Sequence, residues 1–389
     1  MRTSLACLTG SCVLLSLNSA LSAAKFRAVE IDKIEIGYGV TVADVDGDRK
    51  PDILLVDKNQ VAWYHNPDWK KHVIAENLTK LDHVCIAAAD IDGDGKAEIA
   101  IGAGWNPGDT VNSGAVFYLK PGTDRTARWE PIELPHEPTV HRMRWVRNAE
   151  GKSDLVVVPL HGKGNKNGQG DGVKILAYQM PSDLKAPWKT KMINDTLHMT
   201  HNFDPVQWDS DSGFEMLIGS REGSFLFDSK REGLVQLGGK ESGGAGEIRL
   251  GKMKNGRRFF ATVEPMHGTN LVVYVEPLGP QPRQWERHVL DSSLVDGHAL
   301  ACGDLLGQKT DQIVVGWRAM GKPGVKVGIK MFQMRGDEPA NWEPSFVDDN
   351  QMACEDLCLA DLDGDGKLDV IASGRGTKNV KIYFNESSR

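Results

Sequence analysis

One segment of about fourteen residues recurs along the chain, three times almost unchanged. The clear copies are ADVDGDRKPDILLV at residues 43–56, ADIDGDGKAEIAIG at 89–102 and ADLDGDGKLDVIAS at 360–373. Weaker copies lie between the last two, at residues 145–158, 207–219, 250–263 and 303–316. Each copy has the pattern of an apolar strand, a polar turn and a second apolar strand. Repetition of one such unit predicts a ring or array of similar modules.

A second pattern follows most copies and completes the repeat. An apolar strand is followed by a turn, a tryptophan and another short strand, with the tryptophans at Trp69, Trp129, Trp188, Trp285 and Trp342. About four short strands per repeat, without helical periodicity, are typical of one β-propeller blade. We therefore predict an all-β, seven-bladed β-propeller. A strand near residues 26–31 is expected to complete the last blade beside residues 380–384, which closes the ring.

Radial repetition allows one domain of this length, because added blades do not enlarge any single core. The first residues differ from the repeats: a basic start is followed by an apolar stretch at 5–17 and small residues at 19–24. This pattern is typical of a secretory signal peptide, and the stretch is too short for a membrane anchor. We predict a signal peptide at 1–24, a propeller at 25–389 and export to the periplasm or the extracellular space.

Composition and cysteines narrow the partners and the covalent chemistry. The formal net charge is −7, and no basic–aromatic stripe occurs, so we expect no nucleic acid partner. No segment after the N-terminus is apolar enough to predict a membrane span. Four cysteines follow the predicted signal peptide, and either free buried thiols or a Cys302–Cys358 bridge is compatible with the sequence.

The polar turns of the three clear copies carry carboxylates at loop positions 1, 3, 5 and 9. Hard oxygen ligands in that number suit Ca²⁺. An EF-hand would need a glutamate at position 12 and flanking helices, whereas Leu55, Ile101 and Ala372 occupy that position within apolar strands. The turns instead resemble those of FG-GAP/VCBS repeat propellers. We predict structural calcium sites at Asp44, Asp46, Asp48 and Asp52; Asp90, Asp92, Asp94 and Glu98; and Asp361, Asp363, Asp365 and Asp369.

A second set of polar residues falls on the opposite face of the predicted propeller. His83, His141, His201, Glu247, His298 and Glu355 stand where the innermost strands begin, and the turns after the second strands carry Trp105, His161, Arg221, His267, Arg318 and Arg375. Equivalent positions in successive blades converge near the axis, so a pocket is expected there. Ordinary loop polarity is the alternative explanation. Neutral imidazoles can bind Zn²⁺ or Mn²⁺, and an imidazole without a metal can act as a base.

Several short stretches resemble the propeller portion of aldos-2-ulose dehydratase. They are Glu264–Gly268 (EPMHG), residues 297–318 (GHALACGDLLGQKTDQIVVGWR), and the pairs His141–Arg142 and His201–Asn202. The resemblance implies dehydration of a ketosugar such as 1,5-anhydrofructose with the help of a metal ion. In such a reaction a base removes the proton next to the ketone, an arginine or metal stabilises the enolate, and the β-oxygen substituent leaves.

We therefore expect an exported carbon–oxygen lyase or dehydratase that performs β-elimination on a ketosugar or oxidised glycan. The expected catalytic residues are His141, His201, His267, His298 and Arg318. Substrate binding is assigned to Trp105, Arg142, His161, Arg221, Glu355 and Arg375. A Zn²⁺, Mn²⁺ or Mg²⁺ ion is expected among His83, His141, His201 and His298. The alternative is a non-catalytic FG-GAP propeller that binds glycans or a protein partner.

Overall fold

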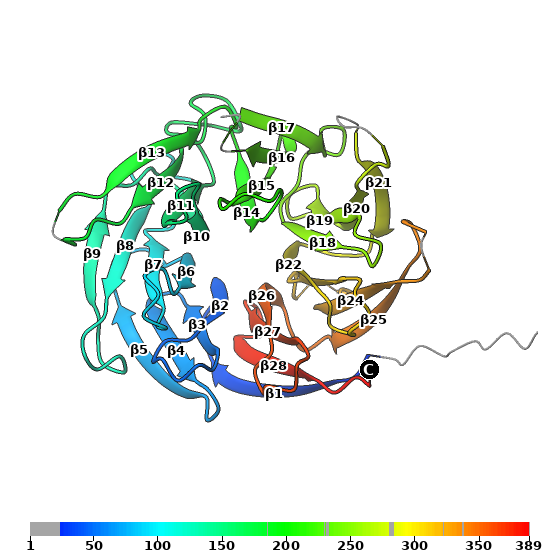
Figure 1. Cartoon of the computed structure of the whole chain (residues 1–389), viewed down its shortest axis with the longest axis horizontal. Helices are drawn as coiled ribbons and strands as arrows, with labels where there is room; N and C mark the ends of the chain where they lie inside the picture. The colour runs from blue at the N-terminus through cyan, green and yellow to red at the C-terminus, as the bar shows by residue number, and fades with distance from the viewer. Residues whose placement is uncertain are drawn as a thin grey trace, which may run out of the picture.

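The chain forms a β-propeller, as predicted (Figure 1). The computed structural model describes residues 24–184, 186–228, 230, 233–279, 284–321, 323–336 and 338–388. Within these residues, 28 strands form seven antiparallel sheets of four strands each. The predicted signal peptide lies outside the described residues except for Ala24. In the described part of the chain, no helix is both long and apolar enough to cross a membrane.

The blades follow one another in chain order, and the strands of each blade are named from the innermost to the outermost. Blade 1 contains β2 (Gly39–Ala43), β3 (Asp52–Val56), β4 (Gln60–His65) and β5 (Lys70–Glu76). Blade 2 contains β6 (Cys85–Ala89), β7 (Glu98–Ala103), β8 (Ala115–Lys120) and β9 (Glu130–Leu134). Blade 3 contains β10 (Val140–Arg147), β11 (Ser153–Pro159), β12 (Ile175–Gln179) and β13 (Lys189–Asn194).

The second half of the ring repeats this order. Blade 4 contains β14 (Thr200–Val206), β15 (Glu215–Ser220), β16 (Gly223–Asp228) and β17 (Gly233–Gly238). Blade 5 contains β18 (Ile248–Lys252), β19 (Arg258–Glu264), β20 (Asn270–Val275) and β21 (Glu286–Asp291). Blade 6 contains β22 (Gly297–Gly303), β23 (Gln312–Trp317), β24 (Gly328–Met334) and β25 (Trp342–Asp349). Blade 7 contains β26 (Cys354–Ala360), β27 (Asp369–Gly374) and β28 (Asn379–Asn385), and β1 (Phe26–Lys33) is its outermost strand.

The two ends of the chain meet in blade 7. Strand β1 pairs antiparallel with β28, from Phe26 opposite Asn385 to Lys33 opposite Asn379. This pairing confirms the predicted closure, and Figure 1 shows the blue and red ends of the chain side by side. Since the last blade takes one strand from the N-terminus, the ring cannot open without breaking a four-stranded sheet.

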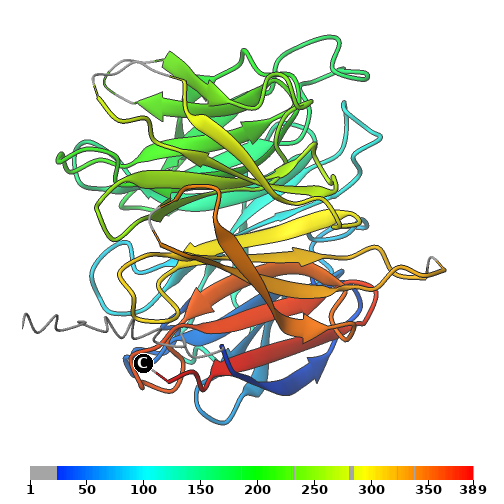
Figure 2. The same ribbon diagram turned by 90° about the vertical axis from the view of Figure 1, so that its right-hand side faces the viewer.

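The position of a strand within its blade explains its composition. Second strands such as β3 and β7 are buried at every residue, because neighbouring blades cover both of their faces. They are accordingly near-continuous apolar runs. Outermost strands such as β1 and β13 keep many exposed residues. Seen from the side, the strands run between two opposite faces, and the hairpin loops lie on those faces (Figure 2).

The cysteines do not cross-link the ring. Cys85, Cys302, Cys354 and Cys358 are all free, so the Cys302–Cys358 bridge is absent. Cys302 and Cys358 lie on neighbouring innermost strands and line a cavity of about 260 Å³ on the axis, together with Arg144 and Arg249. Burial raises the pKa of both thiols, which keeps them protonated and unreactive.

Candidate axial site

Four innermost strands carry a β-bulge at the same position. The pairing with the second strand slips by one residue at His141, His201, His298 and Glu355. The innermost strands of blades 1, 2 and 5 pair without such a slip in their described residues. A bulge inserts an unpaired residue and re-aims its side chain. Each of these four bulges therefore turns one polar side chain away from the regular alternation of the strand and toward the axis.

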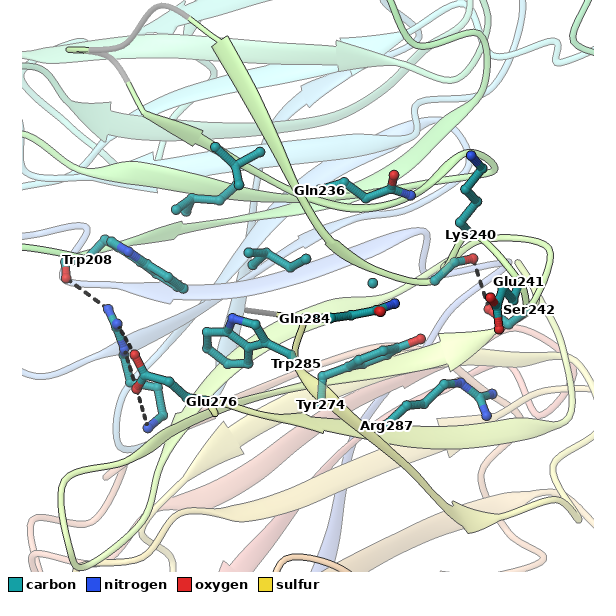
Figure 3. Close-up of a pocket in the computed structure, with 16 residues that line it drawn as sticks. Trp208, Gln236, Lys240, Glu241, Ser242, Tyr274, Glu276, Gln284, Trp285 and Arg287 are labelled. Atoms are coloured by element: carbon teal, nitrogen blue, oxygen red, sulfur yellow. Dashed lines mark hydrogen bonds and ion pairs between the residues drawn. The ribbon is translucent and has the colours of Figure 1, made fainter. Parts of the chain in front are cut away.

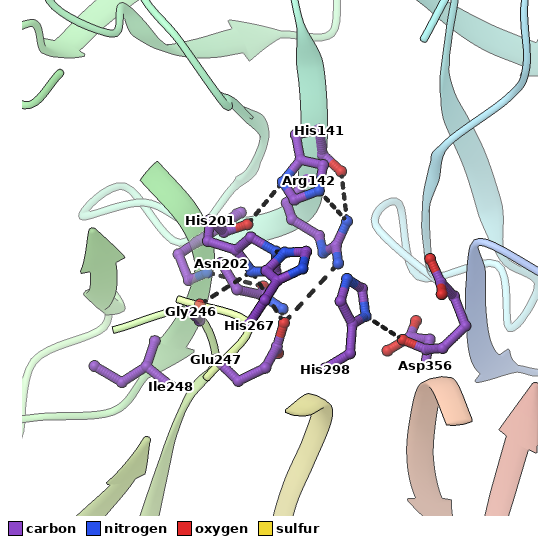
Figure 4. Close-up of polar contacts among 12 residues, drawn as sticks. His141, Arg142, His201, Asn202, Gly246, Glu247, Ile248, His267, His298 and Asp356 are labelled. Carbon is purple, nitrogen blue, oxygen red and sulfur yellow. Dashed lines mark hydrogen bonds and ion pairs between the residues drawn. The ribbon is translucent and has the colours of Figure 1, made fainter. Parts of the chain in front are cut away.

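The four bulged residues line one cavity of about 290 Å³ on the axis. The turns after the second strands of blades 2, 5, 6 and 7 contribute Trp105, His267, Arg318 and Arg375 to the same cavity. Arg142 adds a guanidinium from the residue after a bulge. All five expected catalytic residues and four of the six expected substrate-binding residues thus lie together. Figure 4 shows five of them, namely His141, Arg142, His201, His267 and His298.

Backbone contacts set the orientation of three imidazoles. Nδ1 of His141 lies 2.9 Å from the carbonyl oxygen of His201, and Nδ1 of His201 lies 3.2 Å from the carbonyl oxygen of Gly246. Nδ1 of His298 lies 2.5 Å from the carbonyl oxygen of Glu355. A carbonyl oxygen only accepts hydrogen bonds, so Nδ1 carries the proton and Nε2 keeps its lone pair. Burial lowers the pKa of His201 to about 3 and holds the pKa of His141 and His298 well below the usual value. All three rings are consequently neutral near pH 7.

Three of the imidazoles are close enough to share a metal ion. One ring nitrogen each of His201, His267 and His298 lies within 4.8 Å of the others. The Nε2 atoms of His201 and His267 are 2.6 Å apart, and no hydrogen bond from a described residue reaches Nε2 of His298. Imidazole nitrogens that converge in this way fit Zn²⁺ or Mn²⁺, and three protein ligands leave a position for substrate. The histidine set therefore fits a catalytic metal.

The structure changes the expected metal-binding set at two positions. His141 lies outside the group of three convergent imidazoles, and its Nε2 accepts a hydrogen bond from Nη1 of Arg142 at 3.0 Å. His83 is buried away from the cavity, and its Nε2 accepts a hydrogen bond from the backbone of Leu78 at 3.4 Å. The physical reason is that β6 lacks the bulge that would turn a side chain toward the axis. His267, expected among the catalytic residues, completes the group of three.

Carboxylates surround the imidazoles and hold them in place. Oδ1 of Asp296 lies 3.1 Å from Nδ1 of His267, and Oδ2 accepts a hydrogen bond from Nε of Arg318 at 3.0 Å. Burial opposes ionisation of Asp296, but the contacts with His267 and Arg318 lower its pKa to about 2. Glu247 is almost fully buried 3.2 Å from Nδ1 of His201, and it accepts a hydrogen bond from the amide of Asn202 at 2.6 Å.

Two arginines share one carboxylate at the cavity wall. Nη1 of Arg318 donates to Oε2 of Glu355 at 2.6 Å, and Nη1 of Arg375 donates to Oε1 at 3.1 Å. The guanidinium of Arg375 also lies over the ring of Tyr38, 5.1 Å from its centroid. Across the cavity, the rings of Trp105 and His141 stack at 4.9 Å. Fixed guanidinium groups of this kind can bind a substrate oxygen without rearranging.

Two expected substrate-binding residues lie elsewhere, and two residues of the site were not expected: Tyr38, which lines the cavity, and Asp296, which contacts His267 and Arg318. His161 and Arg221 do not line the cavity, and the exposed Arg221 donates to the carbonyl of Asn167 at 2.9 Å. Tyr38 precedes the innermost strand of blade 1, as His83 does in blade 2, so alignment of the repeats could have revealed it. Asp296 carries no signal in the repeat pattern, because it lies in the connection between two blades.

The Asp-rich turns on the hairpins share one hydrogen-bond pattern. The first aspartate accepts backbone hydrogen bonds from loop positions 4 and 6: Asp44 from Gly47 and Arg49, Asp90 from Gly93 and Gly95, and Asp361 from Gly364 and Gly366. In each turn, oxygens of the first three carboxylates lie within 4.8 Å of one another. The carboxylates at position 9 (Asp52, Glu98 and Asp369) stand outside these groups of three and accept backbone hydrogen bonds.

Blade 4 has a related acidic turn with an internal cation. Asp209, Asp211 and Glu215 form a group of carboxylates like those of the clear copies. Here Nζ of Lys230 lies 3.2 Å from Asp209 and also pairs with Asp211. A lysine ammonium thus offsets part of the negative charge of this turn, as a metal ion could do in the other three.

The fold defines the class: the chain is a seven-bladed β-propeller. Residues 31–101 match the FG-GAP-like repeat and residues 86–119 match the FG-GAP repeat. More particularly, residues 113–277 match the β-propeller domain of aldos-2-ulose dehydratase, a segment that includes His141, His201 and His267. This match suggests a role related to carbohydrates.

Solved structures show the same fold at low sequence identity. A chain of the mitotic checkpoint complex aligns with a TM-score of 0.58 and 10% identity over 98% of both chains. The β-propeller domain of Cps50 (Swd1) from Myceliophteria thermophila aligns with a TM-score of 0.52 and 10% identity, over 92% of this chain and 99% of that one. At such identity these likenesses concern the fold alone. No curated protein sequence matches the chain.

Proposed function

We propose that the chain is a carbohydrate lyase or dehydratase that performs β-elimination on a ketosugar in the axial cavity. The observation that carries the proposal is the convergence of His201, His267 and His298 beside an arginine–carboxylate network. Two of these histidines lie in the segment that matches the dehydratase propeller domain. A cavity with few, fixed polar groups at one end of a propeller axis is suited to a small polar substrate.

His201, His267 and His298 would hold a divalent transition metal such as Zn²⁺ or Mn²⁺. When bound, such an ion supplies Lewis-acid polarisation of a substrate oxygen. Burial keeps His201 and His298 neutral, which is the form in which an imidazole binds a metal ion. Asp296 and the carbonyl oxygens of Gly246 and Glu355 fix the ring orientations from behind, as outer partners of metal ligands commonly do.

His141 is the residue we assign as the base. It lines the cavity, its Nε2 lone pair faces Arg142, and it does not belong to the group of three that can share a metal. In the proposed reaction, Nε2 takes the proton next to the ketone while the β carbon–oxygen bond breaks. The same proton can then pass to the departing hydroxyl, so that water leaves and the base is restored.

The arginines compensate for the low basicity of a buried imidazole. Arg318 and Arg375 present guanidinium groups at the cavity wall, where a developing enolate oxygen can accept their hydrogen bonds. Stabilising that negative charge makes the neighbouring C–H more acidic, so a weak base suffices. Trp105 stacks on His141 and can limit the tilt of its ring.

The proposal also covers the Asp-rich turns and the export of the chain. We assign structural Ca²⁺ to the Asp-rich turns of blades 1, 2 and 7, whose clustered carboxylates suit a hard cation. We also propose export of the chain, on the pattern of its first residues.

The proposal is tested by combining metal analysis with a turnover assay on 1,5-anhydrofructose. We expect a transition metal that His201→Ala and His298→Ala remove while calcium stays. His141→Ala should keep the metal and lower kcat by about 10²–10⁴-fold. His83→Ala serves as the matched control, because that histidine is buried outside the cavity. Calcium as the sole metal, with no dehydrated product seen by NMR, would instead indicate a binding module.

A further inference from the structure

A second, larger cleft lies at the side of the ring, between blades 4 and 5 (Figure 3). Its volume is about 660 Å³, compared with about 290 Å³ for the axial cavity. One wall is the outermost strand of blade 4, β17, and the other consists of side chains from β19 to β21 of blade 5. None of the groups in the proposed reaction lines this cleft.

A short side chain lines the cleft where blades 1 and 2 carry a large ring. In blades 1, 2 and 4, the third residue of the second strand pairs with a residue of the third strand that contacts the next blade. This residue is Trp63 in blade 1, whose Nε1 donates to the carbonyl of Arg125 in blade 2. In blade 2 it is Tyr118, whose ring lies 5.5 Å from that of Trp188 in blade 3. In blade 4 it is Leu226, and the shorter side chain leaves the space beside Trp285 unfilled.

Aromatic rings lie along one side of the cleft, where Trp208 is half-buried and Trp285 and Tyr274 are buried behind the surface. Trp208 and Trp285 lie 5.7 Å apart and inclined by 30°, and Tyr274 continues the same side (Figure 3). The amide groups of Gln236 and Gln284 come from the two opposite walls. The accessible apolar surface of Trp208 and Val235, combined with neutral amide donors and acceptors, suits a ligand that has both apolar faces and hydroxyl groups.

The charges in the cleft are balanced within the protein. Nε of Arg258 donates to Glu276 at 3.0 Å, and Nη2 of Arg287 donates to the buried Glu264 at 2.7 Å. The loop after β17 adds one charge of each sign, from Lys240 and Glu241. A cleft without excess charge favours an uncharged ligand over a phosphorylated or acidic one.

We propose that this lateral cleft binds a neutral oligosaccharide. Pyranose rings offer apolar faces to aromatic side chains and hydroxyl groups to amides, which matches the walls of the cleft. The site would hold a glycan chain at the rim, independently of chemistry at the axis. It goes beyond the proposed reaction, and its existence does not depend on that reaction.

Binding of maltoheptaose, cellohexaose and laminarihexaose to the whole chain, measured by calorimetry and saturation-transfer NMR, tests the proposal. We expect at least one of them to bind, and Gln236→Ala to weaken that binding by about tenfold, as loss of a hydrogen bond in a polar site does. Leu226→Tyr should abolish it, because a tyrosine would fill the space as Tyr118 does in blade 2. Thermal unfolding and metal content, unchanged in both variants, confirm that they fold.

A matched variant separates the cleft from the axis. His298→Ala removes an axial side chain and should leave oligosaccharide binding unchanged. Absence of binding for all three sugars overturns the proposal, as does binding that Leu226→Tyr leaves intact. Loss of binding in His298→Ala would assign the sugar to the axial cavity and equally overturn the lateral site. Each of these outcomes can be interpreted even if the turnover assay fails, because none of them depends on catalysis.

Discussion

At the scale of single residues, Asp296 illustrates how the axial histidines depend on groups behind them. Its carboxylate contacts Nδ1 of His267 and accepts from Nε of Arg318. In Asp296→Asn only one oxygen remains, and the amide NH₂ faces a donor on one side. We expect Zn²⁺ affinity to fall by about 10–100-fold, the usual cost of losing such a partner. Competition titration against a chromophoric chelator measures this change.

The control for this prediction is Asp349→Asn, which removes an exposed carboxylate that pairs only with Lys326. Its Zn²⁺ affinity should equal that of the unmodified chain. Equal affinities in Asp296→Asn as well would show that Asp296 does not orient His267.

Residue patterns predicted most of this site but not its details. Equivalent histidines and arginines in successive repeats were enough to bring five expected catalytic residues into one cavity. They were not enough to exclude His83, because the presence of a bulge depends on pairing between strands and not on the local sequence. Asp296 escaped notice for a similar reason: it lies in a connection between blades, where no periodicity applies.

At the scale of structural elements, the Asp-rich hairpin turns need backbone conformations that most residues resist. Gly95 has φ +82° with no atom within 4 Å of an added Cβ, so its replacement tests conformation without collision. We expect Gly95→Ala to lower the free energy of unfolding by about 1–2 kcal/mol, the cost of a left-handed conformation for a residue with a Cβ. Chemical denaturation measures the change.

Two other turns provide the comparison for Gly95→Ala. Arg49 holds the equivalent position in blade 1 at φ +70°, so Arg49→Gly should leave stability unchanged or raise it by up to about 1 kcal/mol. Gly122→Ala, where φ is not left-handed and no atom lies within 4 Å, should change stability by less than about 0.5 kcal/mol. A similar loss in Gly95→Ala and Gly122→Ala would contradict the assignment of the cost to backbone conformation.

At the scale of the whole molecule, the repeats were the strongest predictor because each one specifies a blade and the ring follows from their number. The closure by β1 was predictable for the same reason: the last repeat ends one strand short. The lateral cleft was not predictable, because it depends on how side chains such as Leu226 and Trp285 pack between two blades. Contacts between blades are absent from any pattern within one repeat.

The three clear Asp-rich turns belong to blades 7, 1 and 2, which are consecutive around the ring and include the blade where the chain ends meet. Calcium bound there would stabilise the closure itself. At a hundredfold excess over Kd, each site adds about 2.7 kcal/mol, so chelation with EDTA should lower Tm by roughly 10 °C. Hydrogen exchange should rise most in β1 and β28, and least in blade 4, where Lys230 already pairs with the acidic turn.

Two variants separate calcium from other effects of EDTA: Asp363→Asn should remove part of the calcium response and Asp211→Asn none of it. A Tm and an exchange pattern that EDTA leaves unchanged would mean that hydrogen bonds within the turns stabilise the ring without calcium.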